Sequence, residues 1–288
     1  MNYEQFIDAM LACTKSKLPG TDIVEVQNVQ KNNGVKLIGL VIRKSNRQIA
    51  PVIYLEEFYK RYLAGWSIAQ LSSMLIERST NIPGIPSWDF EEFKDFSKIQ
   101  DKIVYKLINA KANEELLKEV PHLPMLDFAI VFSLLLSFSE KESGSVLIKN
   151  GHMDYWKCPI SSLYECAKRN TPRLCPSALF LLNELMEEIG EEIYKTSNVY
   201  VLTNQSGTNG AAALLYPGIP RELYEMIGGN YYLLPSSVHE FLIVPEVQEM
   251  VAEELRLIVR EVNATQLERE EFLSDDIYYF DGDIITKI

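Results

Sequence analysis

The sequence predicts an α+β fold with mixed sheets, hairpins and flanking helices, arranged in two subdomains. Helix and strand patterns alternate along the chain, but short turns also join neighbouring strands, which a doubly wound parallel sheet does not contain. Apolar residues make up 47% of the 288 residues and charged residues 24%, which is typical of a globular chain with a real core. Residues 81–88 (NIPGIPSW) contain two prolines and a glycine, which indicates a boundary between the subdomains.

The first subdomain, residues 1–85, is predicted to contain a helix, a hairpin, a further strand and two helices. The hairpin turn is expected at Asn32-Asn33-Gly34 because asparagine and glycine tolerate positive φ. Ser67 is the expected N-cap of the last helix. The predicted elements are helix 3–18, strands 23–29, 35–42 and 51–55, and helices 56–63 and 67–78.

The second subdomain, residues 89–288, is predicted to mix helices and strands. Residues 127–136 form a continuous apolar run, which favours a buried strand over a core helix. Residues 177–189 show leucines at helical spacing and are predicted to be a helix, and the strand at 277–280 is expected at a sheet edge. The other predicted elements are helices 89–96, 113–120, 160–168, 210–216, 221–227 and 246–262, and strands 102–109, 144–148, 199–203, 231–234 and 241–244.

The net charge is −12, and this balance argues against direct nucleic-acid binding, which requires basic surface. From Glu246 to Ile288 there are twelve acidic and four basic residues. This stretch is interpreted as the solvated face of a helix and a polar tail, or as an acidic surface that attracts a basic protein partner or imitates nucleic acid. Arg256, Arg260 and Arg269 interrupt the acidic stretch and weaken the interpretation as a nucleic-acid mimic.

No membrane partner is expected, because the longest apolar run, near residues 128–138, is shorter than the roughly 20 residues of a spanning helix. The N-terminal segment does not have the pattern of a signal peptide, and a cytoplasmic location is expected. The cysteines lack CxxC spacing, which predicts reduced thiols and neither a zinc site nor a redox pair. No cofactor and no metal are predicted.

The candidate catalytic residues are Ser237, His239 and Glu240, which lie in a short polar loop between two apolar strands. Neighbouring side chains diverge, so a structural turn is the alternative interpretation. His152, Asp154 and Asn204 are the candidate binding residues. Residues 206–210 (SGTNG) lack the phosphate-binding signatures and are interpreted as a tight strand-to-helix connection.

Several blocks of the chain carry a family resemblance. They are MNYEQF at the start, the stretch KIVYKLINAKANEELLKEVPHLPMLDFAIVF, the blocks GSVLIKNGHMDYW and LYECAKRNTP, the stretch YVLTNQSGTNGAAALLYPGIPRELYEMIGGNYYLLPSSVHE, and EVNATQLEREEFLSDDIYYFD near the end. With these blocks the chain resembles an uncharacterised bacterial family, a domain of unknown function common in gut Firmicutes and often found near mobile elements. The resemblance covers most of the chain and implies no activity, cofactor or catalytic residue.

The sequence therefore indicates a cytosolic, non-enzymatic protein that binds a macromolecule, for example as an accessory factor of a mobile element. Two alternatives stay open. One is a hydrolase-like enzyme with a site near His239 and Glu240, and the other is an acidic inhibitor that imitates nucleic acid. The partner and the oligomeric state are not indicated by any motif.

Overall fold

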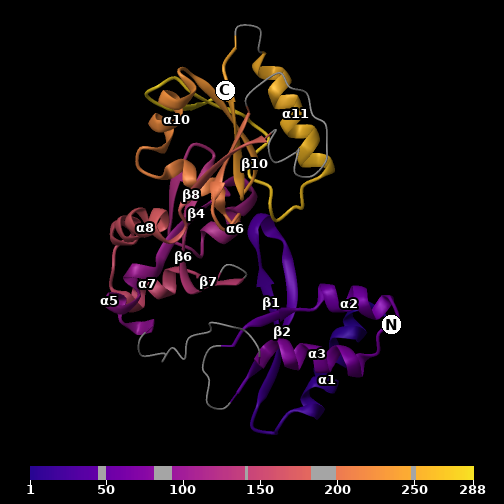
Figure 1. The fold of residues 1–288 in the computed structure, drawn as a ribbon. Coiled ribbons are helices and arrows are strands. Elements are labelled where there is room, and N and C mark those ends of the chain that lie inside the picture. Colours follow the sequence, from indigo (N-terminus) through magenta and orange to yellow (C-terminus); the bar gives the residue numbers. More distant parts are fainter. Residues whose placement is uncertain (45–49, 81–92, 140–141, 183–198, 248–250) are drawn as a thin grey trace. The chain divides into compact units, whose positions relative to one another are not determined.

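A computed structural model describes residues 1–44, 50–80, 93–139, 142–182, 199–247 and 251–288. The chain divides into two compact units. We call residues 1–98 with 136–144 the N-terminal unit, and residues 99–135 with 145–288 the C-terminal unit. The predicted boundary at 81–88 lies outside the described residues, so the subdomain limits 1–85 and 89–288 stay a prediction. The α+β fold class is confirmed by antiparallel sheets and flanking helices in both units (Figure 1).

The N-terminal unit is a three-stranded antiparallel sheet with helices packed on it. Its sheet has the order β1-β2-β3, and β1 pairs with β2 over its whole length. The core between sheet and helices contains Phe6, Met10, Leu40, Phe58 and Leu75, all fully buried. The elements are α1 (Tyr3–Lys17), β1 (Ile23–Gln30), β2 (Lys36–Arg43), β3 (Val52–Tyr54), α2 (Glu56–Leu63) and α3 (Ile68–Thr80).

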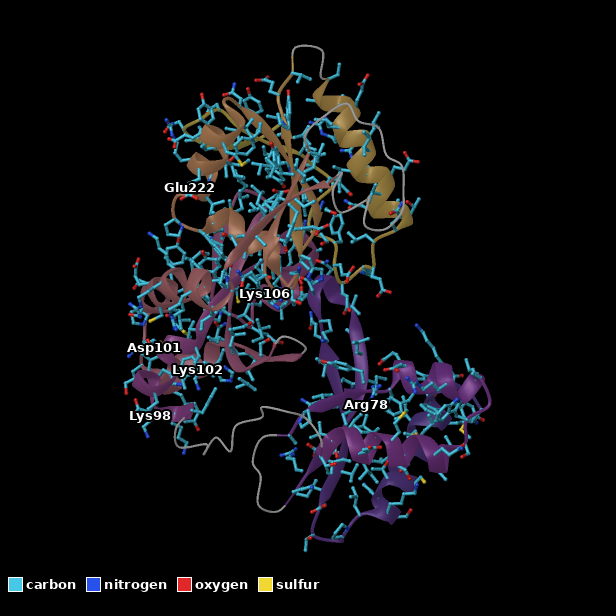
Figure 2. The ribbon with its side chains drawn as sticks, viewed as in Figure 1. Arg78, Lys98, Asp101, Lys102, Lys106 and Glu222 are labelled. Carbon is cyan, nitrogen blue, oxygen red and sulfur yellow. The ribbon has the colours of Figure 1, made fainter. Side chains whose placement is uncertain are left out.

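Local signals in the sequence set the ends of these elements. The side chain of Ser67 accepts a hydrogen bond from the backbone N–H of Gln70 at 3.3 Å, so the predicted N-cap of α3 is confirmed. Asn33 takes a positive φ in the turn between β1 and β2, as expected for asparagine. Near the other end of α3, Arg78 (Figure 2) pairs with Glu57 and covers the ring of Phe58.

The C-terminal unit contains two sheets. A six-stranded antiparallel sheet has the order β13-β12-β10-β11-β9-β8, and a four-stranded sheet has the order β4-β6-β5 with β7 also paired to β6. The strands are β4 (Ile103–Asn109), β5 (His122–Met125), β6 (Phe128–Ser139), β7 (Glu142–Leu147), β8 (Ser177–Leu181), β9 (Tyr200–Asn204), β10 (Tyr231–Ser237), β11 (Glu240–Pro245), β12 (Tyr278–Phe280) and β13 (Ile285–Lys287).

Helices and buried aromatic rings complete the C-terminal unit. Helix α8 packs against β4, and α11 packs against β10. Phe128 of the smaller sheet contacts Phe241 and Tyr278 of the larger one, which joins the two sheets in one core. The helices are α6 (Glu114–Leu117), α7 (Asn150–Trp156), α8 (Ile160–Leu174), α10 (Ile219–Ile227) and α11 (Ala252–Thr265). Helix α5 (Phe96–Ile99) lies at the division between the units. The 3₁₀ segments among the described residues are η1 (Asn32–Gly34), η2 (Gln100–Lys102), η3 (Lys111–Asn113) and η4 (Gly210–Leu215).

Two sequence predictions are wrong. The helix predicted at 177–189 begins as strand β8, because residues 177–181 pair in register with β9; residues 183–189 lie outside the described residues. The strand near 277–280 is not at the edge, because a turn at Gly282, with a φ of +96°, returns the chain as β13, which pairs with β12. In both cases strand pairing with distant or later residues overrides the local pattern.

The boundaries of other helices and strands lie closer to the predicted ones. Helix α11 begins at Ala252, later than predicted, and α8 continues through Pro172 to Leu174. Residues 89–92 of the helix predicted at 89–96 lie outside the described residues. Strand β5 and helix α7 were not anticipated, since Pro124 lies within the strand and Asn150-Gly151 resembles a turn. In the part of the chain that the structure describes, no helix is both long and apolar enough to cross a membrane.

Candidate functional site

The most connected polar region of the C-terminal unit surrounds residues 266–276, which link α11 to β12 and which we call the strap. Side chains from distant parts of the unit hold it. Asn109, at the end of β4, donates a hydrogen bond to the carbonyl of Leu273 at 2.9 Å, and Asn263 of α11 donates to the carbonyl of Ser274 at 2.9 Å. The strap is therefore fixed at both the sheet and the helix.

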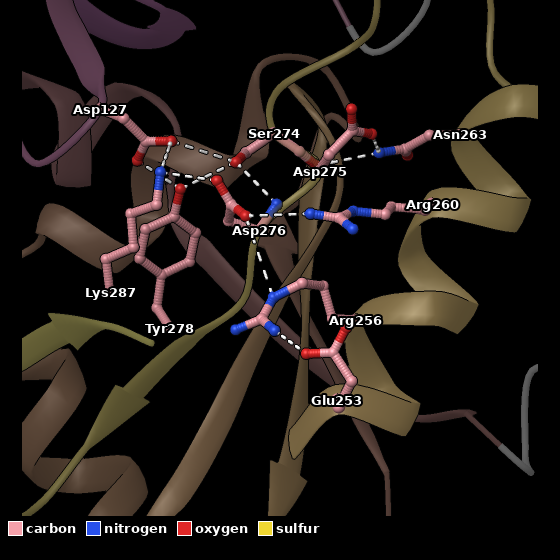
Figure 3. Close-up of polar contacts among 10 residues, drawn as sticks. All are labelled: Asp127, Glu253, Arg256, Arg260, Asn263, Ser274, Asp275, Asp276, Tyr278 and Lys287. Atoms are coloured by element: carbon pink, nitrogen blue, oxygen red, sulfur yellow. Dashed lines mark hydrogen bonds and ion pairs between the residues drawn. The ribbon is translucent and has the colours of Figure 1, made fainter. Parts of the chain in front are cut away.

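A part-buried triad of hydrogen bonds holds the end of the strap in place (Figure 3). The hydroxyl of Tyr278 donates to the carboxylate of Asp127 and lies 2.9 Å from the hydroxyl of Ser274, which itself contacts Asp127 at 3.2 Å. Burial, together with the Asp127 carboxylate, raises the pKa of Tyr278 well above its usual range. A tyrosine held in this way is a permanent hydrogen-bond donor and not a base.

Asp127 follows a residue with a strained backbone. It follows Leu126 in the two-residue turn between β5 and β6, and Leu126 has a φ of +53°. A positive φ is uncommon for a branched non-glycine residue and persists only where surrounding contacts hold it. The hydrogen bonds to the Asp127 carboxylate are such contacts, so the turn and the strap stabilise each other.

A second group of charges continues from this triad to α11 (Figure 3). Lys287 of β13 contacts Asp276 at 2.6 Å and Asp127 at 3.2 Å, and these carboxylates raise the pKa of Lys287. Asp276 also lies 3.9 Å from Arg256 and 3.7 Å from Arg260, both on α11. One carboxylate of the strap thus attracts both arginines of the helix.

The face of α11 opposite Arg256 and Arg260 carries apolar and acidic side chains. Val259 points into the core, whereas Leu257 and Ile258 are 57% and 54% exposed. Glu254 and Glu261 are also exposed and lie one turn before and after this pair. Among the described residues, neither glutamate has an ion-pair partner; Arg256 pairs with Glu253 and lies near Asp276, and Arg260 lies near Asp276.

His239 lies in the turn between β10 and β11 and contacts the strap. Its Nδ1 accepts a hydrogen bond from the backbone N–H of Asn209 at 3.0 Å, and its Nε2 lies 3.5 Å from the carboxylate of Glu271. The first contact assigns the ring proton to Nε2. Both nitrogens are therefore engaged, and the ring joins the loop before η4 to the strap without a free lone pair for base catalysis.

The loop at residues 204–210 is satisfied internally. The backbone N–H of Ser206 donates to Asn204 Oδ1, and that of Gly207 donates to the Asn204 carbonyl. The N–H of Thr208 donates to Ser206 Oγ, and that of Asn209 donates to His239 Nδ1. These N–H groups already have acceptors within the protein and do not converge on a phosphate-binding position. The loop therefore makes a tight strand-to-helix connection, as the sequence predicts. Gly210 is required there, since a Cβ would lie 2.2 Å from Thr203 Oγ1.

The structure brings together some of the predicted site residues. Ser237 accepts a hydrogen bond from the backbone N–H of His239 at 2.9 Å, and Glu240 accepts one from Ser236 at 3.2 Å. Asn204 belongs to the loop that His239 contacts. The hydroxyl of Ser237 thus caps the turn, and a catalytic role for Ser237, His239 and Glu240 stays a prediction.

His152 and Asp154 belong to α7 and therefore to a different element from the loop at residues 204–210. The Nδ1 of His152 accepts a hydrogen bond from the backbone N–H of Lys149 at 3.1 Å, which caps the helix, and Asp154 is exposed. Burial, with a smaller effect of Lys149, lowers the pKa of His152. Among the described residues, no group of three His, Cys, Asp or Glu side chains could hold a metal ion.

Sequence reasoning missed the residues of the strap. Asp127 and Tyr278 are 151 positions apart, and no local pattern connects them. The only signal was an aspartate directly before a buried strand, a position where a carboxylate usually faces solvent.

A sequence profile of DUF5688, a family of unknown function, matches residues 3–282. This match confirms the predicted membership in a family of unknown function. No curated protein and no solved structure matches the chain with significant similarity.

Replacing Tyr278 by phenylalanine should destabilise the C-terminal unit by about 1–3 kcal/mol, because Asp127 and Ser274 lose a buried donor. Urea unfolding followed by circular dichroism measures this change. The neighbouring Tyr279→Phe is the control, since the Tyr279 hydroxyl bonds to the exposed carboxylate of Glu246 and to Asn230, which also donates to Glu246; it should change the free energy of unfolding clearly less than Tyr278→Phe does. Equal effects of the two substitutions would contradict a stabilising role for the hydrogen bonds among Tyr278, Asp127 and Ser274.

The substitution Gly210→Ala should destabilise the protein by at least about 1–3 kcal/mol, because the new Cβ meets Thr203 Oγ1 at 2.2 Å and the His239 carbonyl at 2.5 Å. Thermal unfolding checks the prediction. Gly229→Ala is the matched control, since nothing lies within 4 Å of its Cβ position. If both alanine variants have the melting temperature of the wild type, the close approach of Thr203 and the His239 carbonyl to Gly210 is refuted.

The lowered pKa of His152 predicts a pH-dependent stability. The unfolded chain takes up the imidazole proton near pH 6.5, before the folded protein does, so stability is fully present above that pH and decreases as the pH falls through it. Urea unfolding between pH 5 and 8 should show a smaller decrease for His152→Gln, which keeps an acceptor for the Lys149 N–H. Parallel pH profiles for both proteins would be inconsistent with this assignment.

Proposed function

Since the chain belongs to DUF5688, a family of unknown function, we propose its role from its own surfaces: it is a non-enzymatic protein that binds another protein through the outer face of α11. The observation that carries this proposal is the exposure of Leu257 and Ile258 on a helix whose arginines pair with Glu253 and Asp276. Large exposed apolar side chains that lie together are typical of interaction sites.

The apolar part of this face supplies binding energy. Leu257 and Ile258 are adjacent, and both are more than half exposed, although α11 already buries Val259 and other side chains against β10. Covering two such side chains removes apolar area from water, which favours association by about 25 cal/mol per Å² before the costs of binding are subtracted.

The charged part of the face selects the partner. Glu254 and Glu261 border the apolar pair, and the region from Glu246 to Ile288 has twelve acidic and four basic residues. An acidic rim around an apolar centre is complementary to a protein segment whose apolar side chains are flanked by lysine or arginine. The association rate should therefore decrease as salt is added.

A cytoplasmic site of action and an accessory role, for example beside a mobile element, are parts of this proposal. The four cysteines are all free, which supports a reducing compartment. Neither alternative function is favoured by the contacts of the described residues. Both ring nitrogens of His239 are engaged, and arginines lie among the carboxylates of α11.

The double substitution Leu257→Gln and Ile258→Gln should weaken partner binding at least tenfold, about 1.4 kcal/mol, because it removes the apolar anchors and keeps good helix formers. Tagged wild-type and variant proteins are used to capture partners from cells of the source organism. Each partner that depends on the two residues is then purified, and its binding is measured by calorimetry at two salt concentrations.

The control variant carries Met226→Gln and Ile284→Gln, which replace two other exposed apolar side chains of the same unit. It should bind as the wild type does. The proposal requires a direct complex that is lost in the α11 variant, kept in the control and weakened by salt. It is refuted if every captured partner binds the α11 variant as tightly as the wild type, or if binding is insensitive to salt.

A further inference from the structure

Strand β1 of the N-terminal unit is a long, open sheet edge (Figure 1). Among the described residues it pairs only with β2, from Ile23 opposite Arg43 to Gln30 opposite Lys36. No backbone hydrogen bond outside that pairing involves residues 23–30 within the described part of the chain. In an antiparallel pair every second residue turns its N–H and C=O away from the partner strand, so β1 presents a row of unpaired donors and acceptors.

The side chains of β1 do not protect this edge. Proteins usually block an open edge with lysine, proline or a bulge, and β1 (IVEVQNVQ) contains neither lysine nor proline and pairs with β2 without a register shift. Its only charged residue, Glu25, is neutralised by an ion pair with Arg43 of β2. Ile23 is 57% and Val26 39% exposed, so apolar side chains accompany the open backbone.

The charge around the edge is opposite to that of the whole protein. Residues 22–44, which include β1 and β2, contain four basic residues and two acidic ones, Asp22 and Glu25, in a chain with a net charge of −12. Lys31 lies over the ring of Tyr54 at 4.4 Å, and Lys36 is exposed opposite the end of β1. The hairpin therefore carries a net positive charge in an otherwise acidic chain and attracts negative charge, although Lys31 itself lies over Tyr54 of β3, at the other edge of the sheet.

We propose that β1 accepts an extended, acidic peptide segment of a partner protein, which adds to the sheet as a fourth strand. Backbone hydrogen bonds supply the affinity. Ile23 and Val26 lie on opposite faces of β1, so apolar side chains of the peptide contact Ile23 on one face of the sheet or Val26 on the other. Acidic side chains of the peptide face the basic hairpin. This surface lies in the other unit from α11 and selects a partner of opposite charge, so it is independent of the function proposed above.

The test uses the full chain and a synthetic peptide of about ten residues that alternates valine with glutamate and threonine. Binding is measured by fluorescence anisotropy, and amide hydrogen exchange reports the residues that become protected. The peptide should bind and slow exchange at residues 23–30. The same peptide with alternate backbone nitrogens methylated should bind at least tenfold more weakly, since it cannot form the edge hydrogen bonds.

Variants separate strand addition from general attraction. Ile23→Glu with Val26→Glu should weaken binding at least tenfold, whereas Leu63→Glu, at a 65% exposed leucine of the same unit, should change it less than twofold. The proposal is overturned if residues 23–30 are not protected at millimolar peptide, or if the methylated peptide binds equally well. It is also overturned if a DNA or RNA oligonucleotide protects these residues and displaces the peptide, because the edge is then a nucleic-acid surface.

Discussion

The part-buried hydrogen bond from Tyr278 to Asp127 connects the two sheets of the C-terminal unit. It joins an inner strand of the six-stranded sheet to a turn of the four-stranded sheet, and Ser274 contacts both partners. Because Ser274 belongs to the strap, the bond also fixes Asp276, which attracts Arg256 and Arg260 of α11. The character of the outer face of that helix therefore depends on a contact in the interior of the unit.

The two proposed surfaces differ in charge and in mode of recognition. The face of α11 offers apolar side chains bordered by glutamates, whereas β1 offers open backbone beside a basic hairpin. One surface belongs to each unit, so the two units can contact different partners. Under these two proposals the protein acts as an adaptor, which needs two complementary surfaces.

The sequence predicted the parts of the fold that local patterns determine. The first helix, the β1–β2 hairpin and the Ser67 cap follow from short-range signals, and these were confirmed. Strand β8 was mistaken for the start of a helix because its leucines suit either period and its pairing with β9 is not visible locally. The polar strap was missed for the same reason, since Asp127 and Tyr278 meet only after the sheets have formed.

The division between the units passes through a single hairpin. Strands β6 and β7 are paired, yet residues 136–144 belong to the N-terminal unit and the flanking residues to the C-terminal unit. A fragment ending at Lys98 would consequently lack a piece of its own structure, and the remaining fragment would carry an orphaned loop. Dissecting this protein into separately folding halves therefore calls for grafting or circular permutation and not for simple truncation.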